Sequence, residues 1–141
     1  MRSLNLPSYP FKIKSSKGKK QIFDEIRKKY VALTPEEWVR QHFVKFLIYE
    51  KNYPKGLIAI EATLSYNSLI KRSDIVAYNH LGKPILIVEC KAPGIKLTQN
   101  VFDQAAMYNL VLNVGYIIIT NGLSHYCCTI NKKKPHLEFV K

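Results

Sequence analysis

The sequence predicts an α/β domain in which two main helices flank a mixed central sheet. Three observations lead to this fold class: a helical pattern over residues 34–50, three strand-like runs after it, and a second helical pattern at 97–113 that precedes an apolar run. Because a strand–helix–strand step is almost always a right-handed crossover, the last of these strands should lie parallel to a neighbour. The expected order is therefore helix, three strands, helix, strand.

The chain is long enough for one domain with one hydrophobic core. It has 141 residues, and 47% of them are hydrophobic, which is ordinary for a globular protein. We expect a single domain over residues 1–141, with an N-terminal hairpin at about 9–24 and a core at about 33–130. Residues 11–23 indicate two short strands around a Ser-Ser-Lys-Gly turn, whereas the pattern of 24–33 is ambiguous and is interpreted as a bend followed by a short extended piece.

The first helix has a clear amino-terminal signal. Thr34 can cap the helix, Pro35 suits its first position, and Glu37 completes a capping box with Thr34. One apolar stripe then recurs at helical spacing through about Glu50, and it contains Trp38, Val39, His42, Phe43, Phe46, Leu47 and Tyr49.

Three strand-like runs follow, at residues 57–66, 69–78 and 84–90. The last two are joined by residues 79–83, a hairpin-length segment rich in turn formers. Residues 85–88 are continuously apolar, as expected of a central strand that is buried on both faces.

The second helical pattern covers residues 97–113, with a stripe of Val101, Ala105, Tyr108 and Leu112. Residues 116–120 are a further apolar run that predicts a buried strand. Two closing strands are expected at 124–130 and 137–140, around a lysine-rich turn.

The charge balance indicates a polyanionic partner. Lysine and arginine outnumber aspartate and glutamate 22 to 10, which gives a formal net charge of +12. Such a surplus suits nucleic acid or an anionic membrane surface, although it also serves plain solubility. We find neither the roughly 20 consecutive apolar residues of a membrane helix nor an apolar run typical of a signal peptide. Two of the three cysteines are adjacent, which makes a poor disulfide framework and favours a cytoplasmic location.

Two acids and a lysine lie on neighbouring predicted strands. Asp74 is in the second strand of the three, and Glu89, Cys90 and Lys91 end the third. Alternation along a strand places Glu89 and Lys91 on one face and Cys90 on the other. Because a short hairpin joins the two strands, Asp74 and Glu89 are expected to be neighbours.

This group has the chemistry of a divalent-metal site. Two close carboxylates repel each other, and burial makes their ionisation harder still. Mg²⁺ resolves the conflict, since it accepts carboxylates, carbonyls and water, so we expect Asp74, Glu89 and the Cys90 carbonyl as ligands, with Mn²⁺ able to substitute. Lys91 would orient or deprotonate an attacking water. The alternative is a structural ion pair in which Lys91 neutralises both acids.

Asp74, a hairpin and then Glu89-Cys90-Lys91 resemble the core motif of the PD-(D/E)XK nuclease superfamily. Five segments in order resemble more closely the nuclease domain at the N-terminus of type I restriction-enzyme motor subunits, in its stand-alone form. The resemblance extends over residues 20–130 or so, and the segments are 33–41, 72–76, 88–93, 103–109 and 120–122. Ser73 stands where the superfamily motif has proline.

The resemblance implies a restriction-endonuclease-like core and a set of roles. Asp74 and Glu89 would bind Mg²⁺, and Lys91 would assist the hydrolysis of DNA. Gln104 and Tyr108 match the Gln-x-x-x-Tyr motif of such nucleases. Because they are four residues apart on a helix, they share a face from which both can reach DNA or the attacking water.

Other polar residues keep two interpretations each. Glu37 is either the helix acid that some superfamily members aim at the metal or simply part of the capping box. Arg40 and Gln41 either contact phosphate or are solvated. Sequence-independent contacts with the DNA backbone are expected from Lys71, Arg72 and Lys96, and from the basic residues Lys14, Lys17, Lys19, Lys20, Arg27, Lys28 and Lys29.

Two functions of different class follow. The first is a Mg²⁺-dependent DNA endonuclease of a restriction or repair system, acting alone, as a homodimer or with partner subunits. The second is a non-catalytic nucleic-acid-binding or interaction module that retains the nuclease fold. The chain lacks a Gly-x-x-x-x-Gly-Lys-Ser/Thr loop, so these residues do not encode an ATP motor.

Overall fold

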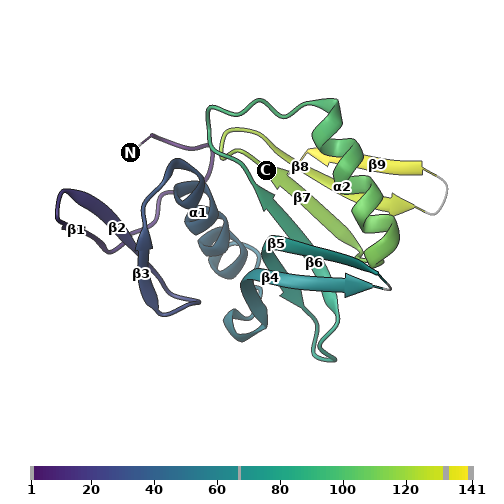
Figure 1. Ribbon diagram of the computed structural model, residues 1–141, viewed down its shortest axis with the longest axis horizontal. Helices are drawn as coiled ribbons and strands as arrows, with labels where there is room; N and C mark the ends of the chain where they lie inside the picture. Colours follow the sequence, from purple (N-terminus) through teal and green to yellow (C-terminus); the bar gives the residue numbers. More distant parts are fainter. Residues whose placement is uncertain (1, 67, 132–133, 140–141) are drawn as a thin grey trace.

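The computed structural model describes residues 2–66, 68–131 and 134–139, which form a small sheet, a larger mixed sheet and two main helices (Figure 1). The small sheet has three strands in the order β1-β2-β3, and the larger sheet has six in the order β4-β5-β6-β7-β8-β9. The α/β prediction, with two helices flanking a mixed sheet, is therefore confirmed.

The small sheet is antiparallel and consists of β1 (Ile13–Ser16), β2 (Lys19–Asp24) and β3 (Lys29–Ala32). The predicted hairpin is confirmed, and its turn places Lys17 and Gly18 at φ 53° and 76°. The ambiguous stretch 24–33 becomes a turn and a third strand, because the Asp24 carboxylate accepts hydrogen bonds from the backbone N–H groups of Ile26 and Arg27, both at 2.8 Å.

Helix α1 (Pro35–Tyr49) begins as the sequence predicts. The Thr34 hydroxyl accepts a hydrogen bond from the Glu37 N–H at 3.0 Å. The reciprocal half of a capping box does not form, since the Thr34 N–H donates to the Ala32 carbonyl and the Glu37 carboxylate has other partners. A short 3-10 turn, η1 (Lys55–Leu57), leads into the larger sheet.

The larger sheet is antiparallel except where β6 and β7 pair in parallel across the α2 crossover. Its strands are β4 (Ile58–Tyr66), β5 (Leu69–Tyr78), β6 (Pro84–Cys90), β7 (Tyr116–Thr120), β8 (His125–Asn131) and β9 (Lys134–Phe139). The parallel step was expected. β9 begins at Lys134 rather than at the predicted residue 137, so Pro135 lies inside a strand. A proline is tolerated there because β9 is the edge strand of the sheet. The predicted last residue of this strand, 140, is outside the described part of the chain.

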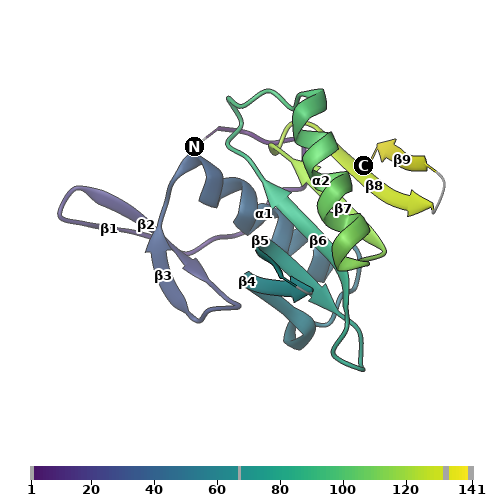
Figure 2. The same cartoon turned by 45° about the vertical axis from the view of Figure 1, so that its right-hand side comes forward.

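Helices α1 and α2 (Gln99–Leu112) cover opposite faces of the larger sheet (Figure 2). On the α1 face, Val39 and Phe43 pack with Ile75 and Val88. On the α2 face, the core cluster includes Ala105, Val76, Ile87, Ile117 and Ile119. β6 is thus buried on both sides, as its continuous apolar run predicts.

Neither helix among residues 2–66, 68–131 and 134–139 has the length and apolar character needed to cross a membrane.

Candidate active site

The carboxyl-terminal ends of the neighbouring parallel strands β6 and β7 lie side by side at one end of the larger sheet. Glu89 pairs in register with Ile119, and Cys90 pairs with Thr120. The Lys91 N–H donates to the Thr120 carbonyl at 2.8 Å, which extends the pairing by one residue. The backbone that carries Glu89 and Lys91 is therefore held by its neighbour up to the point where the strand ends.

Alternation along β6 separates the site from the core. The Cys90 side chain is 1% exposed and belongs to the apolar cluster beneath α1. Glu89 and Lys91 point to the other face, toward α2, where they line one cavity. Glu89 and Lys91 therefore lie on one face of β6 and Cys90 lies on the other, as predicted.

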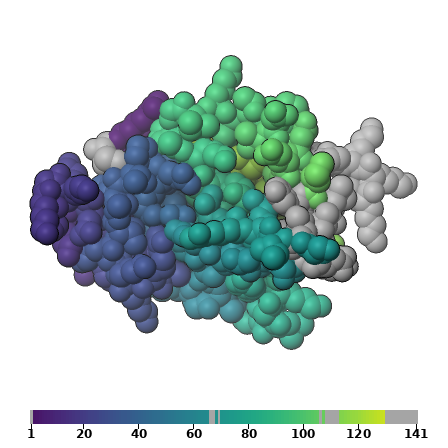
Figure 3. Space-filling model, viewed as in Figure 1, coloured from purple at the N-terminus to yellow at the C-terminus, as the bar shows by residue number. Residues whose placement is uncertain are grey.

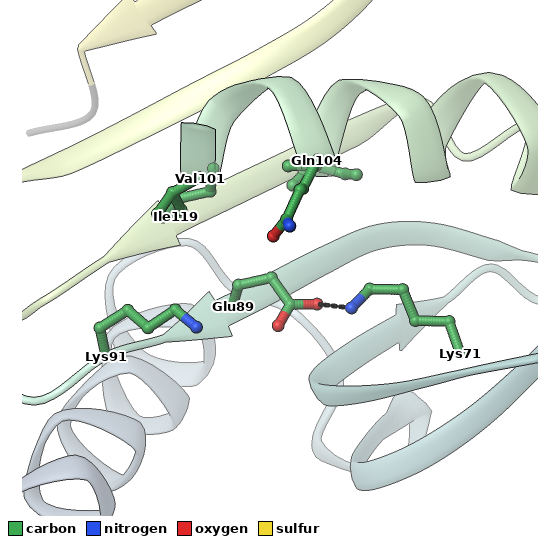
Figure 4. A pocket seen from close by; sticks show the side chains of 8 residues that line it. Lys71, Glu89, Lys91, Val101, Gln104 and Ile119 are labelled. Atoms are coloured by element: carbon green, nitrogen blue, oxygen red, sulfur yellow. Dashed lines mark ion pairs between the residues drawn. The ribbon is translucent and has the colours of Figure 1, made fainter. Parts of the chain in front are cut away.

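That cavity has a volume of about 60 Å³ and gathers four polar side chains (Figure 4). Lys71 enters from β5, Glu89 and Lys91 from the end of β6, and Gln104 from α2, and Figure 4 shows the other three directed toward Glu89. The apolar lining consists of Val101, Ala105, Ile117 and Ile119. A carboxylate is thus set among two cations and an amide on an apolar floor.

Glu89 is the electrostatic centre of this cavity. Burial raises the pKa of the Glu89 carboxyl above its usual range; the positive charge of Lys71 opposes the increase, and the negative charge of Asp74 adds to it. The Lys71 Nζ lies 3.1 Å from Glu89 Oε1 in an ion pair, and a hydrogen bond from Lys71 also acts to lower the pKa of Glu89. Lys71 is therefore the cation that pairs with this buried carboxylate in the structure.

Asp74 lies beside this cavity, but its side chain lines a different one. Its Oδ2 accepts a hydrogen bond of 2.6 Å from the Cys90 N–H, and its Oδ1 lies 3.5 Å from the Arg40 guanidinium. With Arg40, it helps to line a cleft of about 390 Å³ on the α1 side, together with Thr34, Glu36, Glu37, Glu61 and Arg72. Asp74 and Glu89 are neighbours, as predicted, but they face the solvent through separate openings.

The Glu37 carboxylate is occupied by protein donors. Arg40 donates to it at 2.6 and 3.0 Å, Arg27 at 3.1 and 3.2 Å, and Gln41 at 2.9 Å. Burial acts to raise the pKa of Glu37, but the hydrogen bonds from Arg40 and Gln41 and the charges of Arg40 and Arg27 lower it overall. Glu37 is a structural anchor in this arrangement, and its candidate role toward a metal stays a prediction.

The proposed phosphate contacts divide by exposure. Gln41 is 1% exposed and its amide donates to Asp24 and Glu37, so the structure does not bring it to the surface. Arg40 is 8% exposed and lines the cleft beside Asp74. Arg72 is exposed and pairs with Glu61, and Lys96 is exposed in the loop between β6 and α2. Tyr108 lies on α2, but its side chain is outside the described part of the chain.

Two cations next to the acids were not foreseen in those positions. Lys71 was expected to contact DNA, but it forms the ion pair with Glu89, and Arg40 reaches Asp74. The alternative in which Lys91 neutralises both acids is thus not the pairing found among the described residues. Glu61 was also missed; counting back from the β4–β5 hairpin places it opposite Asp74, between the pairs Ile60–Ile75 and Ala62–Ser73.

The donor set limits the kind of metal that would fit. Among residues 2–66, 68–131 and 134–139 there is no group of three or more His, Cys, Asp or Glu side chains suited to a metal ion. Asp74 and Glu89 supply two carboxylates. This set is too small for a closed zinc site, but it suits Mg²⁺, which usually uses one or two protein carboxylates and keeps several waters.

Comparison with known proteins identifies the family. Residues 35–141, more than half of the chain, match the family described as type I restriction enzyme R protein N terminus (HSDR_N). Among solved structures, the chain is similar to a fragment of a putative HsdR subunit of a type I restriction enzyme from Vibrio vulnificus YJ016, with a TM-score of 0.56 and 19% identity over 75% of this chain. The chain spans 23% of that fragment, and the likeness concerns the fold alone. No curated protein matches it. The protein belongs to the type I restriction enzyme R protein N-terminal family.

Proposed function

We propose that this protein is a Mg²⁺-dependent endonuclease that hydrolyses phosphodiester bonds of DNA as part of a restriction system. The observation that carries the proposal is the cavity in which Glu89 and Lys91 project together from the end of β6, beside Asp74 on β5. The order α1, β4, β5, β6, α2, β7 supports a restriction-endonuclease-like core of the PD-(D/E)XK type. Membership of a restriction-enzyme family supports the same chemistry.

Asp74 and Glu89 would hold the metal, with the Cys90 carbonyl as a third ligand. The raised pKa of the Glu89 carboxyl, caused by burial and by the charge of Asp74, means that ionising both acids costs free energy. A dication would offset that cost. Bound Mg²⁺ supplies Lewis-acid polarisation of the phosphate and a water of lowered pKa.

The side chains around Glu89 provide the remaining groups. Lys91 would orient or deprotonate the attacking water and stabilise the negative charge that develops on the phosphate. Lys71 neutralises Glu89 in this structure, and it is placed to contact a phosphate once a dication takes over that task. Gln104, on the opposite wall of the cavity, would hold the water or the DNA by hydrogen bonds.

Plasmid cleavage tests the proposal. Purified protein with supercoiled plasmid and Mg²⁺ should produce nicked circles, Mn²⁺ should support the same reaction, and EDTA should abolish it. Replacing Lys91 by alanine should reduce the rate about a hundred-fold or more, the usual contribution of a general acid–base group. Lys83→Ala is the matched control, because Lys83 is an exposed lysine in the turn between β5 and β6. Undiminished cutting by a pure Lys91→Ala protein would refute the assignment.

Calorimetry separates this function from a non-catalytic module that keeps the fold. The wild-type chain should bind Mg²⁺ and Mn²⁺, and the Asp74→Asn and Glu89→Gln variants should lose that binding. A binding module without a metal site would give no metal-dependent heat in any of the three proteins. Light scattering with and without DNA would measure whether the chain is a monomer or a homodimer.

A further inference from the structure

The amino-terminal residues that form the small sheet lie at one end of the molecule (Figure 3), and their strands belong to a sheet separate from the larger one. The small sheet precedes residue 35, where the family match begins, so the family assigns it no role. Its exposed lysines are Lys12, Lys14, Lys17, Lys19, Lys20, Lys28 and Lys29. The role of this basic sheet therefore has to be inferred from its own residues and contacts.

The strand register gives this sheet two different faces. Ile22 and Asp24 on β2 are fully buried, so the face they share points inward. The opposite face carries Phe23, which pairs with Tyr30 across to β3, and Lys14, which pairs with Gln21. The outer face therefore combines lysines and aromatic rings, and the inner face attaches the sheet to the protein.

On the outer face, lysines lie over aromatic rings. The Lys14 Nζ is 4.1 Å from the centroid of the Tyr30 ring, and the Lys12 Nζ is 5.7 Å from that of Phe23. The two rings meet edge to face with their centroids 5.2 Å apart. These cation–π contacts favour defined positions for the two ammonium groups above the sheet.

The acids of this segment do not neutralise that face. Asp24 is buried and its carboxylate is paired with Arg27, at 2.7 Å. Glu25 pairs with Lys45 and Lys55, at 3.0 and 2.9 Å, from α1 and η1. Within the described ranges, no lysine of the small sheet forms a salt bridge. The outer face is an uncompensated positive surface.

We infer that the outer face of the β1–β3 sheet is a docking surface for nucleic acid, which contacts its phosphodiester backbone through Lys12, Lys14 and Lys19. Positive charge combined with aromatic rings is the combination that nucleic-acid-binding sheets use, with the lysines on phosphates and the rings against bases or sugars. Binding to an anionic bilayer would require exposed apolar side chains that insert into it. The large exposed apolar residue of this sheet, Ile13, is on the inner side in register with Ile22, so the backbone polyanion is the favoured partner.

Ion pairs connect this surface to the candidate active site. Arg27, in the turn after β2, donates to Glu37 on α1 and to Glu61 on β4, at 3.1 and 3.0 Å. Arg40 binds the same two carboxylates and lies 3.5 Å from Asp74. DNA on the sheet would thus be held in a fixed relation to Asp74, a consequence that rests on the proposed nuclease function.

Binding in EDTA tests the surface without cleavage. Fluorescence anisotropy of labelled duplex and single-stranded DNA should give a dissociation constant about ten-fold higher for Lys12→Gln/Lys14→Gln than for wild type at moderate salt. The slope of log affinity against log salt should fall by about 2, since each lost phosphate contact removes about 0.9. The control is Lys51→Gln/Lys83→Gln, which removes the same charge from exposed lysines elsewhere and should leave both quantities unchanged. Circular dichroism and melting curves verify that all variants are folded.

The outcomes separate this surface from the catalytic proposal. In EDTA no cleavage can occur, so the weaker binding of Lys12→Gln/Lys14→Gln should be measured whether or not the wild type cuts plasmid in Mg²⁺. Equal losses in the two double variants would mean that only net charge matters, and would overturn the docking surface. Phosphatidylserine vesicles are the competing partner: vesicle binding that is stronger than DNA binding and depends on Lys12 and Lys14 would overturn it too.

Discussion

At the scale of single residues, the site depends on how one carboxyl group is surrounded. Glu89 is flanked by Lys71, Lys91 and Gln104, and burial raises its pKa. A raised carboxyl pKa means that the neutral form is favoured in the fold, so the associated stability is present at low pH and is lost as pH rises through the folded-state pKa. At neutral pH the ionised group therefore lowers the stability of the metal-free protein.

This gives a prediction for Glu89→Gln. In EDTA at pH 7 the variant should melt at a higher temperature than the wild type, because it removes the cost of a buried charge, and this advantage should disappear below pH 4. Mg²⁺ at tenfold its dissociation constant should stabilise the wild type by about 1.4 kcal/mol, roughly 4 °C, and leave the variant unchanged. Glu50→Gln, at an exposed acid after α1, should behave as wild type in both conditions. Equal Mg²⁺ responses in Glu89→Gln and wild type would exclude Glu89 as a ligand.

At the scale of elements, local patterns predicted most of the strands and helices. The apolar stripe of α1, the continuous apolar run in β6 and the turn formers of the β5–β6 hairpin are backbone-local signals, and each produced the expected element. The sequence indicates β3 only as a short extended piece after a bend, because its turn depends on the Asp24 side chain and on Lys28 at φ 55° rather than on glycine. Such side-chain-assisted turns leave only a weak trace in the sequence.

The turn between β7 and β8 holds the amino-terminal segment against the core. Gly122 has a φ of +84°, and a Cβ there would lie 2.8 Å from Leu4 and 3.1 Å from Val39. The Asn5 N–H also donates to the Gly122 carbonyl at 2.8 Å. This glycine combines a left-handed conformation with a close approach of two side chains.

Gly122→Ala should therefore lower the free energy of unfolding by about 2 kcal/mol, from backbone strain and displaced packing. Chemical denaturation measures this directly. Gly56→Ala is the control, because Gly56 has no positive φ and open space around it, and its change should stay within about 0.5 kcal/mol. A Gly122→Ala protein as stable as the control would show that Leu4 moves aside without cost.

At the scale of the whole molecule, a buried ion network joins the small sheet to the larger one. Asp24 is fully buried and accepts hydrogen bonds from Arg27 and from Gln41, at 2.7 and 2.9 Å. Burial acts to raise the pKa of Asp24, but the hydrogen bonds from Arg27 and Gln41 and the charge of Arg27 lower it overall, and the pKa of Glu37 is lowered in a similar way. The network therefore stabilises the folded protein when the carboxyl groups of Asp24 and Glu37 are ionised.

The pH dependence follows from the sign of these shifts. A lowered carboxyl pKa contributes stability that is complete above the ordinary carboxyl range and is lost as pH falls through the folded-state pKa. The unfolding free energy should therefore decrease steeply below about pH 4. Asp24→Asn should cost about 3 kcal/mol at pH 7, because Arg27 loses a buried partner, and should flatten the acid limb. Asp103→Asn, at an exposed acid on α2, should change neither. An unaltered acid limb in Asp24→Asn would assign the pH dependence to other carboxyls.

The sequence by itself determined the fold class, the order of the elements and the common face of Glu89 and Lys91, because helix and strand periodicities are properties of a few consecutive residues. Only the tertiary structure decided which cation neutralises which acid. Lys71 meets Glu89 and Arg40 meets Asp74 because β5, β6 and α1 approach one another, and the burial of Gln41 has the same origin. Such pairings join residues that are far apart in the chain, so their partners depend on packing geometry that no local pattern encodes.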